Sequence, residues 1–294
     1  MTWQCFQLTY ELHSPLHVGY HRIANLQRTR YYLPARNLWG AVTERLTRSG
    51  FGVAILQRSA EDYSAVGDWV KAHCAFGYFF IWNGSCLLSP DYDAQTGDLR
   101  YGNLSVGEFE QVYLASHVTT ALEAATTSAE IGSLHEIETI TSITAQYGRT
   151  FLRGDVFLDE EAVKYLGDLS KWQKWLGELM VGGERRYGFG RLRLSDQKGW
   201  VEIGHRDDFP PEGQKYPRPR IRLSEDDPLQ AHACIEGLQA RGGLEPLVGR
   251  ETRDDSQGFG RALTNAQICW TPGSRVCHAV TFEITRSGWW QKVE

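Results

Sequence analysis

The sequence lacks several features that would assign it to a common class. It has no apolar run near the roughly 20 residues that span a bilayer, and its first residues, MTWQCFQLTYEL, alternate like a strand and not like a signal peptide. Its six cysteines contain no C-x-x-C pair, so the usual zinc spacing is absent and neither a metal nor a cofactor is expected. We therefore expect a cytoplasmic protein with reduced cysteines and no membrane partner.

Lysine is also scarce, since only seven of the 31 basic residues are lysines and the other 24 are arginines. Arginine is the better residue for forked phosphate contacts and for stacking on bases. The net charge of −5 ordinarily argues against a nucleic-acid partner, but residues 1–60 carry +5 and residues 91–161 carry −10. A chain polarised in this way can present a basic face to a polyanion, although uneven surface charge is an equally simple explanation.

The hydrophobic pattern predicts an α+β fold. Strands are expected at 3–12, 76–82, 86–88, 110–118, 134–143, 150–158, 191–194 and 200–203, and helices at 37–50 and 159–181. Asn37 is a suitable helix N-cap, Gly50 a suitable end, and Asn83-Gly84 a hairpin turn. Residues 16–32 and 119–132 show no period and are expected to be loops. The order of elements is that of a ferredoxin-like (RRM-like) βαββαβ core with insertions.

The second half of the chain suggests a division into domains. Residues 1–206 hold the predicted core, and residues 207–219 contain four prolines, which indicates a linker or a surface crossing. Residues 220–294 are expected to contain a helix near 228–241 and strands near 267–270 and 277–285. This C-terminal extension is either a small second lobe, such as a degenerate second ferredoxin-like unit, or a set of elements that completes the first domain.

The most unusual segment is GGERRYGFGRLR at 182–193, which combines four glycines, four arginines and two aromatic residues. Glycines allow close approach to backbone amides, arginines contact phosphates, and aromatic rings offer faces to bases. No G-K-[ST] follows, which excludes a Walker loop, and the glycines precede a strand, which argues against a Rossmann fingerprint. The candidate RNA contacts in this glycine loop are Arg185, Arg186, Tyr187, Gly188, Phe189, Gly190 and Arg191. The alternative is a turn with solvated arginines.

A second basic segment, SPLHVGYHRIANLQRTRYYLPARNLWGA, interleaves arginines and tyrosines. Its candidate RNA contacts are His17, His21, Arg22, Arg28, Arg30 and Arg36. His17 or His21 is also a candidate general base that takes the 2′-hydroxyl proton in metal-independent RNA cleavage. Histidines that contact phosphate or solvent, and an ordinary basic loop, are the simpler explanations. Spacing of four at His13, His17 and His21 suits metal ligands on a helix, but Ser14-Pro15 and Gly19 disfavour a helix there.

A third segment, TTALEAATTSAEIGSLHEIETI, has a run of small polar residues followed by acids. Its small residues suit an excursion that folds against a partner. Glu130, His135, Glu136 and Glu138 suggest a metal site, but alternation puts Glu136 and Glu138 on one strand face, where a solvated acidic surface is the simpler interpretation.

Three motifs in order, HSPLHVGY, YLPARNLWGAVTERL and GGERRYGFGRLRL, resemble the RAMP (repeat-associated mysterious protein) superfamily of CRISPR systems. In that family a first strand ends in a "PLHxG" loop, a Pro-led helix start follows, and a "GGxxxxGFG" loop precedes the last strand. The segment SHVTTALEAATTSAEIGSLHEIETI resembles the one placed before the third strand. The resemblance implies a ferredoxin-like RNA-binding domain over residues 1–206. By position it assigns RNA contact to His17, Gly19, Arg22, Trp39, Gly40, Arg185, Arg186, Gly188, Phe189 and Gly190.

The resemblance also implies a role. We expect a structural subunit of a type III effector ribonucleoprotein in antiviral defence that grips the CRISPR RNA, with other subunits and target RNA as further partners. Subunits that cut target RNA carry an Asp after "HxG", whereas this chain has Asn25 and no acid there, and Ala35-Arg36-Asn37 replaces the family's Gly-Ser-Ser. We therefore expect binding without catalysis. The alternatives are a metal-independent endoribonuclease that processes repeat RNA, and a small-molecule-binding or structural protein with a fortuitous glycine loop.

Overall fold

The computed structural model describes residues 2–51, 60–93, 95–123, 128–130, 132–196, 199–203, 216–251 and 262–293. Its largest sheet has the order β15-β16-β1-β14-β5-β6, with β17 also paired to β1 and β4 also paired to β14, and all of these pairs are antiparallel. The strands are β1 (Trp3–Leu12), β4 (Cys74–Phe76), β5 (Phe80–Trp82), β6 (Leu87–Leu88), β14 (Phe151–Asp159), β15 (Glu178–Met180), β16 (Arg191–Leu194) and β17 (Trp200–Ile203). The α+β class is confirmed.

The longest strands were predicted from alternation. Phe6, Leu8, Tyr10 and Leu12 of β1 are all buried, because every second side chain of a strand faces the same side. Strand β14 pairs with β1 over nine residues and was expected at nearly these bounds. The hairpin at Asn83-Gly84 is also confirmed, since β5 and β6 pair across it.

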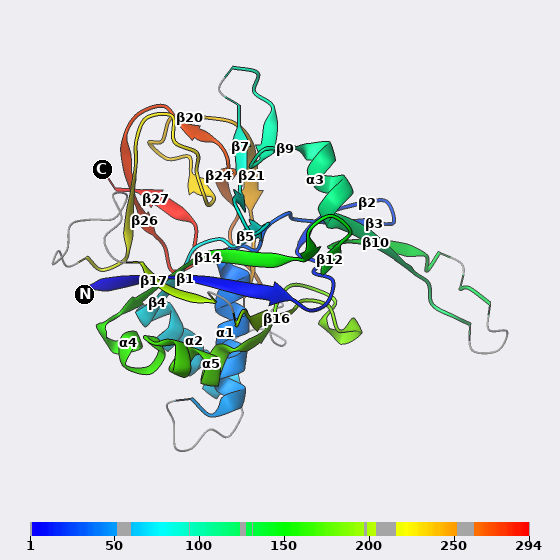
Figure 1. The fold of residues 1–294 in the computed structure, drawn as a ribbon, viewed down its shortest axis with the longest axis horizontal. Coiled ribbons are helices and arrows are strands. Elements are labelled where there is room, and N and C mark those ends of the chain that lie inside the picture. The colour runs from blue at the N-terminus through cyan, green and yellow to red at the C-terminus, as the bar shows by residue number, and fades with distance from the viewer. Residues whose placement is uncertain are drawn as a thin grey trace.

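The described helices are α1 (Ala35–Ser49), α2 (Ala60–His73), α3 (Val106–Tyr113), α4 (Glu160–Leu166) and α5 (Leu169–Leu176). In Figure 1, α2, α4 and α5 lie below β1 and β14 with α1 beside them, whereas α3 lies apart, beside β9 and β10. Helix α1 ends at Gly50 as predicted, with φ 71°, but its N-cap is Pro34 and not Asn37. Helix α2 was not predicted. None of the described helices is both long and apolar enough to cross a membrane.

The single helix expected at 159–181 is wrong in its extent. It is divided into α4 and α5, because Gly167 ends the first and the Asp168 side chain accepts a hydrogen bond from the amide of Lys171 at the start of the second. Asp159 caps α4 in the same way. Residues 178–180 belong to strand β15 because they pair with β16.

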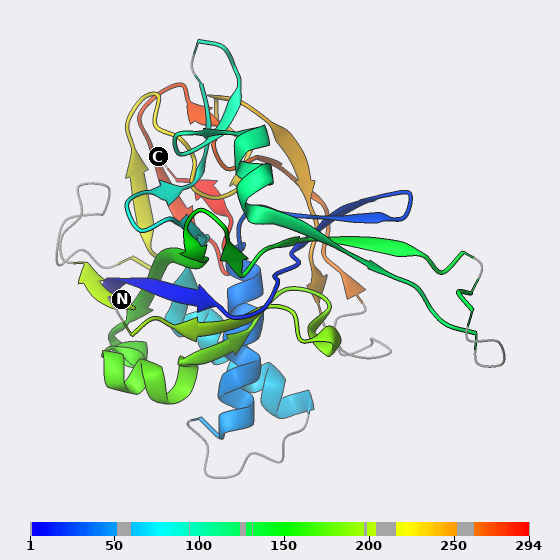
Figure 2. The same cartoon turned by 45° about the vertical axis from the view of Figure 1, so that its right-hand side comes forward.

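Two hairpins project from the same side of the molecule and form a four-stranded sheet in the order β10-β11-β3-β2 (Figure 2). The strands are β2 (Gly19–Ile23), β3 (Leu26–Thr29), β10 (Leu114–Thr119) and β11 (His135–Ile140). The expectation of a loop over 16–32 is therefore wrong. The strand expected at 110–118 begins only at Leu114, since the preceding residues end helix α3, which starts with a capping box at Ser105 and Glu108.

Shorter strands complete the first part of the chain. A three-stranded sheet contains β7 (Pro90–Tyr92), β8 (Leu99–Tyr101) and β9 (Leu104–Ser105), and a two-stranded one contains β12 (Ile143–Thr144) and β13 (Gly148–Arg149). The turn expected at Gly148 is thus present, with φ 69° at that residue.

The described C-terminal residues form strands. A six-stranded sheet has the order β18-β26-β27-β19-β24-β21, formed by β18 (Arg220–Leu223), β19 (Ala233–Cys234), β21 (Leu244–Leu247), β24 (Gln267–Trp270), β26 (Val280–Ile284) and β27 (Trp290–Lys292). Two pairs lie beside it, β20 (Ala240–Arg241) with β25 (Arg275–Val276) and β22 (Arg250–Glu251) with β23 (Ala262–Leu263). The helix expected near 228–241 is wrong, because β19 pairs with both β24 and β27.

Most of the buried apolar residues of both parts belong to one cluster, which includes Phe6 of β1 and Phe282 of β26. Polar contacts also join the two parts, since the Tyr78 hydroxyl lies 2.7 Å from Nδ1 of His232. Of the predicted linker, 207–215 lies outside the described residues, and Tyr216 accepts a hydrogen bond from the Trp3 indole. The division at 206 and 220 stays a prediction.

Candidate RNA-binding surface

The glycine loop lies directly on the "PLHxG" loop that follows β1. The amide of Gly183 donates to the carbonyl of His17 at 2.8 Å, and the amide of Gly190 donates to the carbonyl of Pro15 at 2.7 Å. The amide of Arg191 donates to the Ser14 hydroxyl at 2.9 Å. Two motifs about 170 residues apart in the sequence therefore form one unit in the structure.

The glycines allow this contact at two positions in particular. Gly182 and Gly190 have φ of 77° and 76°, and a Cβ atom there would lie 2.3 Å from the His17 carbonyl oxygen and 1.8 Å from the Val181 carbonyl oxygen. Only glycine fits such a close approach with a left-handed backbone. The sequence predicted that the glycines let another chain approach the backbone amides. The amides of Gly183 and Gly190 are not available for this, because they already donate to carbonyls of the protein itself.

The tip of the loop is a short 3₁₀ turn, Arg185–Tyr187, that points its side chains outward. Arg185, Arg186 and Tyr187 are exposed, the last by 63%. Arg185 lies 3.9 Å from Glu44 of α1. Within the described ranges, Arg186 forms no ion pair with a carboxylate. An ordered backbone thus holds two arginines and an aromatic ring toward solvent.

Residues from two other elements flank this tip. The ring of Phe189 lies 5.1 Å from the ring of His117 on β10. Arg48 on α1 pairs at 2.7 Å with Glu44, the carboxylate that Arg185 also approaches. His117 was not among the predicted site residues. Its sequence neighbours gave no signal for it, because only the path of the β10–β11 hairpin brings it to the loop.

The two candidate histidines have different surroundings. His17 is 5% exposed, and its Nδ1 lies 2.8 Å from the carbonyl oxygen of Glu138 on β11. Its ring also lies under Gly183, where a Cβ would approach it to 3.1 Å. His17 therefore joins the loop to β11. His21 on β2 is exposed and contacts the ring of Tyr20 edge-on at 4.2 Å.

Three arginines lie in or directly after the β2–β3 hairpin. One is exposed, and the other two pair with carboxylates. Arg22 is exposed, and its Nε donates to the carbonyl of Ala24. Arg28 is half-buried and lies 3.4 Å from both Glu110 and Glu138.

Arg30 is the more buried of the two arginines that pair with carboxylates. It pairs with Glu245 of β21 at 2.7 Å and lies over the Tyr20 ring at 4.7 Å. The paired carboxylates neutralise part of the charge of Arg28 and Arg30. Both arginines therefore attract a phosphate less strongly than a free arginine does.

Of the predicted residues of helix α1, Trp39 and Arg36 pack against other parts of the chain, and Gly40 lies one turn before Glu44, which Arg185 approaches. The indole of Trp39 donates to the carbonyl of Gly67 at 3.1 Å, and Lys71 lies 4.5 Å above its ring, so it packs between α1 and α2. Arg36 packs over Gly249, whose Cβ would lie 2.6 Å from its Nε. A Cβ on Gly40 or on Gly188 would meet nothing within 4 Å, so those glycines are not needed for close packing. Gly19 begins the exposed strand β2.

The segment that contains Glu130, His135, Glu136 and Glu138 forms no metal site in the described part of the chain. No group of three or more His, Cys, Asp or Glu side chains could hold a metal ion among the described residues. His135 instead contacts Thr119 at 2.7 Å, and Glu138 accepts a hydrogen bond from the amide of Thr29. All six cysteines are free thiols.

The comparisons with known proteins concern the fold. No family model matches the sequence, and no curated protein matches it. A chain in a cryo-EM structure of the Type III-B Cmr-beta bound to cognate target RNA and AMPPnP, in state 1, is similar with a TM-score of 0.54 and 11% identity, over 92% of this chain and 85% of that one. A chain in the Type III-B Cmr-beta bound to cognate target RNA gives a TM-score of 0.51 and 12% identity, over 92% and 86%. This protein therefore shares its fold with chains of a type III CRISPR effector complex, as the resemblance predicted.

Proposed function

We propose that this chain is an RNA-binding subunit of a type III CRISPR ribonucleoprotein and that it grips the backbone of the guide RNA with the tip of its glycine loop. The single observation that carries the proposal is the construction of that tip. Gly182 and Gly190 dock the loop against its own chain, while Arg185, Arg186 and Tyr187 stay exposed. Preordered arginines lose less conformational entropy on binding a phosphate than arginines on a free segment.

The topology supports a ferredoxin-like core. Strands β16, β1, β14 and β4 or β5 lie in that order, which is fourth, first, third and second along the chain when β4 and β5 count as one strand. Helices α1 and α2 lie between the first and second of these strands, and α4 and α5 between the third and fourth. This is the order of a βαββαβ unit, with β10, β11 and α3 as insertions.

The similar solved structures support the partners. Both are of the Type III-B Cmr-beta, and both are bound to cognate target RNA. We therefore propose CRISPR RNA, target RNA and other subunits of a type III complex as the partners of this chain. In such an assembly Tyr187 offers a flat face for stacking, and Arg185 and Arg186 neutralise phosphates.

The test is RNA binding by the purified chain at several salt concentrations. We expect Arg185→Ala/Arg186→Ala to lower the affinity for single-stranded RNA at least about ten-fold at low salt, since charge-assisted hydrogen bonds contribute about 1.5–3 kcal/mol each. The slope of log affinity against log salt should fall by about 1.4, because about 0.7 counterions are released per phosphate of a single strand.

The matched control is Arg100→Ala/Arg222→Ala, which removes two exposed arginines from β8 and β18. This pair should leave both the affinity and the salt slope unchanged. Equal losses of RNA affinity in the two double variants would show that the glycine loop does not bind the RNA backbone. Absence of RNA binding by the wild type, even at low salt, would favour a small-molecule-binding or structural protein.

The endoribonuclease alternative needs a histidine that reaches a 2′-hydroxyl. His21 is exposed, whereas the ring of His17 is buried and one of its nitrogens contacts a carbonyl. Incubation of the protein with repeat RNA in EDTA distinguishes the hypotheses. A binding subunit leaves the RNA intact; cleavage that is lost in His21→Ala would instead identify an enzyme with His21 as its base.

A further inference from the structure

A cavity of about 280 Å³ lies where the β2–β3 hairpin meets the β7–β8–β9 sheet and the C-terminal strand β21. Its most unusual feature is a lining of five tyrosines, Tyr20, Tyr31, Tyr32, Tyr92 and Tyr101. The volume is near the lower end of the roughly 300–1,000 Å³ that small-molecule sites occupy. We refer to it as the tyrosine cavity.

One wall of the tyrosine cavity is fixed by a buried ion pair. Arg30 donates to Glu245 at 2.7 Å and to the hydroxyl of Tyr32 at 3.2 Å. Its guanidinium also lies 4.7 Å from the centre of the Tyr20 ring, which is a cation–π distance. His232 contacts the same oxygen of Glu245, Oε1. These contacts order the wall without a ligand.

The opposite wall is fixed by a second set of contacts. Arg28 donates to the hydroxyl of Tyr31 at 2.6 Å, and that hydroxyl in turn donates to Glu110. The Tyr31 ring stacks on Phe109 at 5.3 Å and lies 5.5 Å from Tyr101. The two walls therefore present aromatic surfaces whose positions are set by packing and by ion pairs.

The charges of the lining select the kind of ligand. Each arginine faces a carboxylate, so a phosphate inside the cavity would meet Glu110 and Glu245 as well as the cations. A neutral flat ring with polar edges avoids this repulsion and can stack on tyrosine. Burial and the nearby Glu245 raise the pKa of Tyr20, so its hydroxyl stays protonated.

We propose that the tyrosine cavity binds one unstacked nucleobase of the RNA strand, with the phosphates left outside. The inference rests on the proposed function, since the strand supplies the base. Tyr20 stands at the rim, 47% exposed, between Gly19 and His21 on β2. Arg22 lies on the same exposed strand, so a backbone that follows β2 passes the mouth of the cavity.

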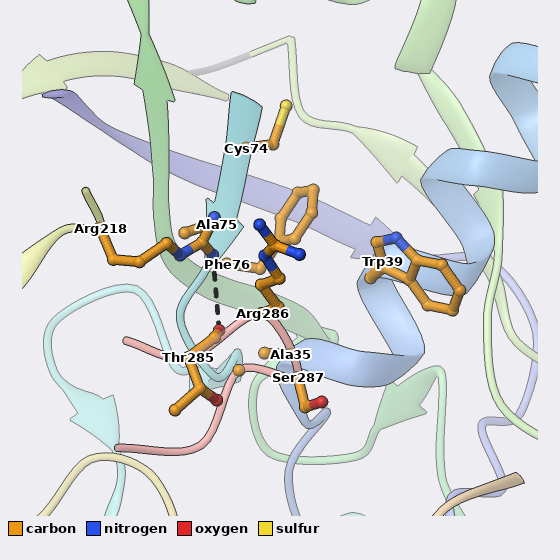
Figure 3. A pocket seen from close by; sticks show the side chains of 10 residues that line it. Ala35, Trp39, Cys74, Ala75, Phe76, Arg218, Thr285, Arg286 and Ser287 are labelled. Atoms are coloured by element: carbon orange, nitrogen blue, oxygen red, sulfur yellow. Dashed lines mark hydrogen bonds between the residues drawn. The ribbon is translucent and has the colours of Figure 1, made fainter. Parts of the chain in front are cut away.

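A second cavity near the C-terminal part does not suit a ligand. It lies between Trp39 and Ala35 of α1, Cys74–Phe76 of β4 and residues 285–288, with the guanidinium groups of Arg218 and Arg286 beside it (Figure 3). Its volume is about 10 Å³, which is room for a single water molecule. Arg218 already donates to the carbonyls of Ile284, Lys71 and Thr285.

The experiment uses 2-aminopurine, a fluorescent base that loses its emission when it stacks on an aromatic ring. In one arm a single 2-aminopurine is moved along a short single-stranded RNA, and in the other the free 2-aminopurine riboside is titrated. We expect quenching in the RNA arm at a subset of positions. Tyr20→Ala/Tyr92→Ala should abolish it and weaken RNA binding at least about five-fold, since one stacked base contributes about 1–3 kcal/mol.

Tyr165→Ala is the matched control, because that tyrosine is 43% exposed on α4 and far along the chain from the lining. It should leave the quenching intact. Unchanged quenching in Tyr20→Ala/Tyr92→Ala would overturn the proposal. A different outcome is that RNA does not bind, whereas the free riboside is quenched and this quenching requires Tyr20 and Tyr92. That result would support a nucleobase site in the cavity, but it would overturn the RNA strand as the source of the base and the proposed function with it.

Discussion

At the scale of single residues, the glycines of the loop have two different roles. Gly190 combines a left-handed backbone with a Cβ position 1.8 Å from a carbonyl oxygen, whereas Gly188 has a similar φ of 83° with open space around it. Gly190 is therefore required for docking of the loop, and Gly188 only for the shape of the turn. The family resemblance identified both glycines without separating these roles.

This difference predicts unequal costs for the same substitution. Gly190→Ala should lower the free energy of unfolding by more than about 3 kcal/mol, because it adds a clash with Val181 to the backbone strain. Gly188→Ala should cost only about 1–2 kcal/mol, the strain of a left-handed residue. Denaturant unfolding of the two variants measures both values. Equal costs would contradict the docking role of Gly190.

At the scale of elements, prediction succeeded where the local pattern of the sequence displays the element, even for short strands such as β16 and β17. Strand β1 was predicted because its ten residues alternate. Strand β2 is exposed along its whole length and shows no alternation, and β3 pairs with β11, which is far along the chain. Helix α2 was missed. Gly67 interrupts its helical pattern, yet the helix needs a small residue there, because a Cβ would approach the Trp39 ring to 3.1 Å.

The ion pairs of Arg28 join the β2–β3 hairpin to β11 and α3 and give a prediction at the scale of elements. Arg28→Gln removes the contacts of β3 with Glu138 of β11 and Glu110 of α3. It should lower the free energy of unfolding by about 1 kcal/mol, as expected for the loss of charged hydrogen bonds at half-buried groups. The salt slope of RNA binding should stay unchanged, in contrast to Arg185→Ala/Arg186→Ala. A slope reduced by about 0.7 would instead identify Arg28 as a phosphate contact.

At the scale of the whole molecule, a buried polar network joins the two parts of the chain. Tyr78 lies 2.7 Å from one nitrogen of His232, and the other nitrogen contacts Glu245, which also binds Arg30. With a neutral imidazole, the Tyr78 hydroxyl donates to Nδ1 and the Nε2–H donates to the carboxylate, so every group has a partner. His232 and Glu245 come from the C-terminal part and Tyr78 and Arg30 from the first 206 residues.

The network predicts loss of stability in acid. Burial lowers the pKa of His232 below its ordinary 6.5. Burial opposes ionisation of Glu245, but His232 and Arg30 outweigh it and lower the pKa of that carboxyl to about 2. Both groups bind protons more readily in the unfolded chain, so the unfolding free energy falls as pH drops below 6.5 and falls further between 4.5 and 2.

The measurement is the unfolding free energy between pH 7 and pH 4.5 for the wild type and for His232→Gln. The variant should show a shallower pH dependence, since one titrating group contributes at most about 1.4 kcal/mol per pH unit. His278→Gln is the control, because His278 is exposed, and its pH dependence should match that of the wild type. A slope in His232→Gln as steep as in the wild type would exclude the network as the acid-sensitive element.

The sequence by itself determined the α+β class, the long central strands, the hairpin at Asn83-Gly84 and the motifs that resemble RAMP proteins. These depend on local periodicity, turn geometry and residue order, which a single chain displays directly. Only the tertiary structure decided that the glycine loop docks on the His17 loop, that Arg28 and Arg30 are braces while Arg185 and Arg186 are exposed, and that five tyrosines surround one cavity. Those properties depend on which distant segments meet, and pairing and burial, not the local sequence, set the exposure of each side chain.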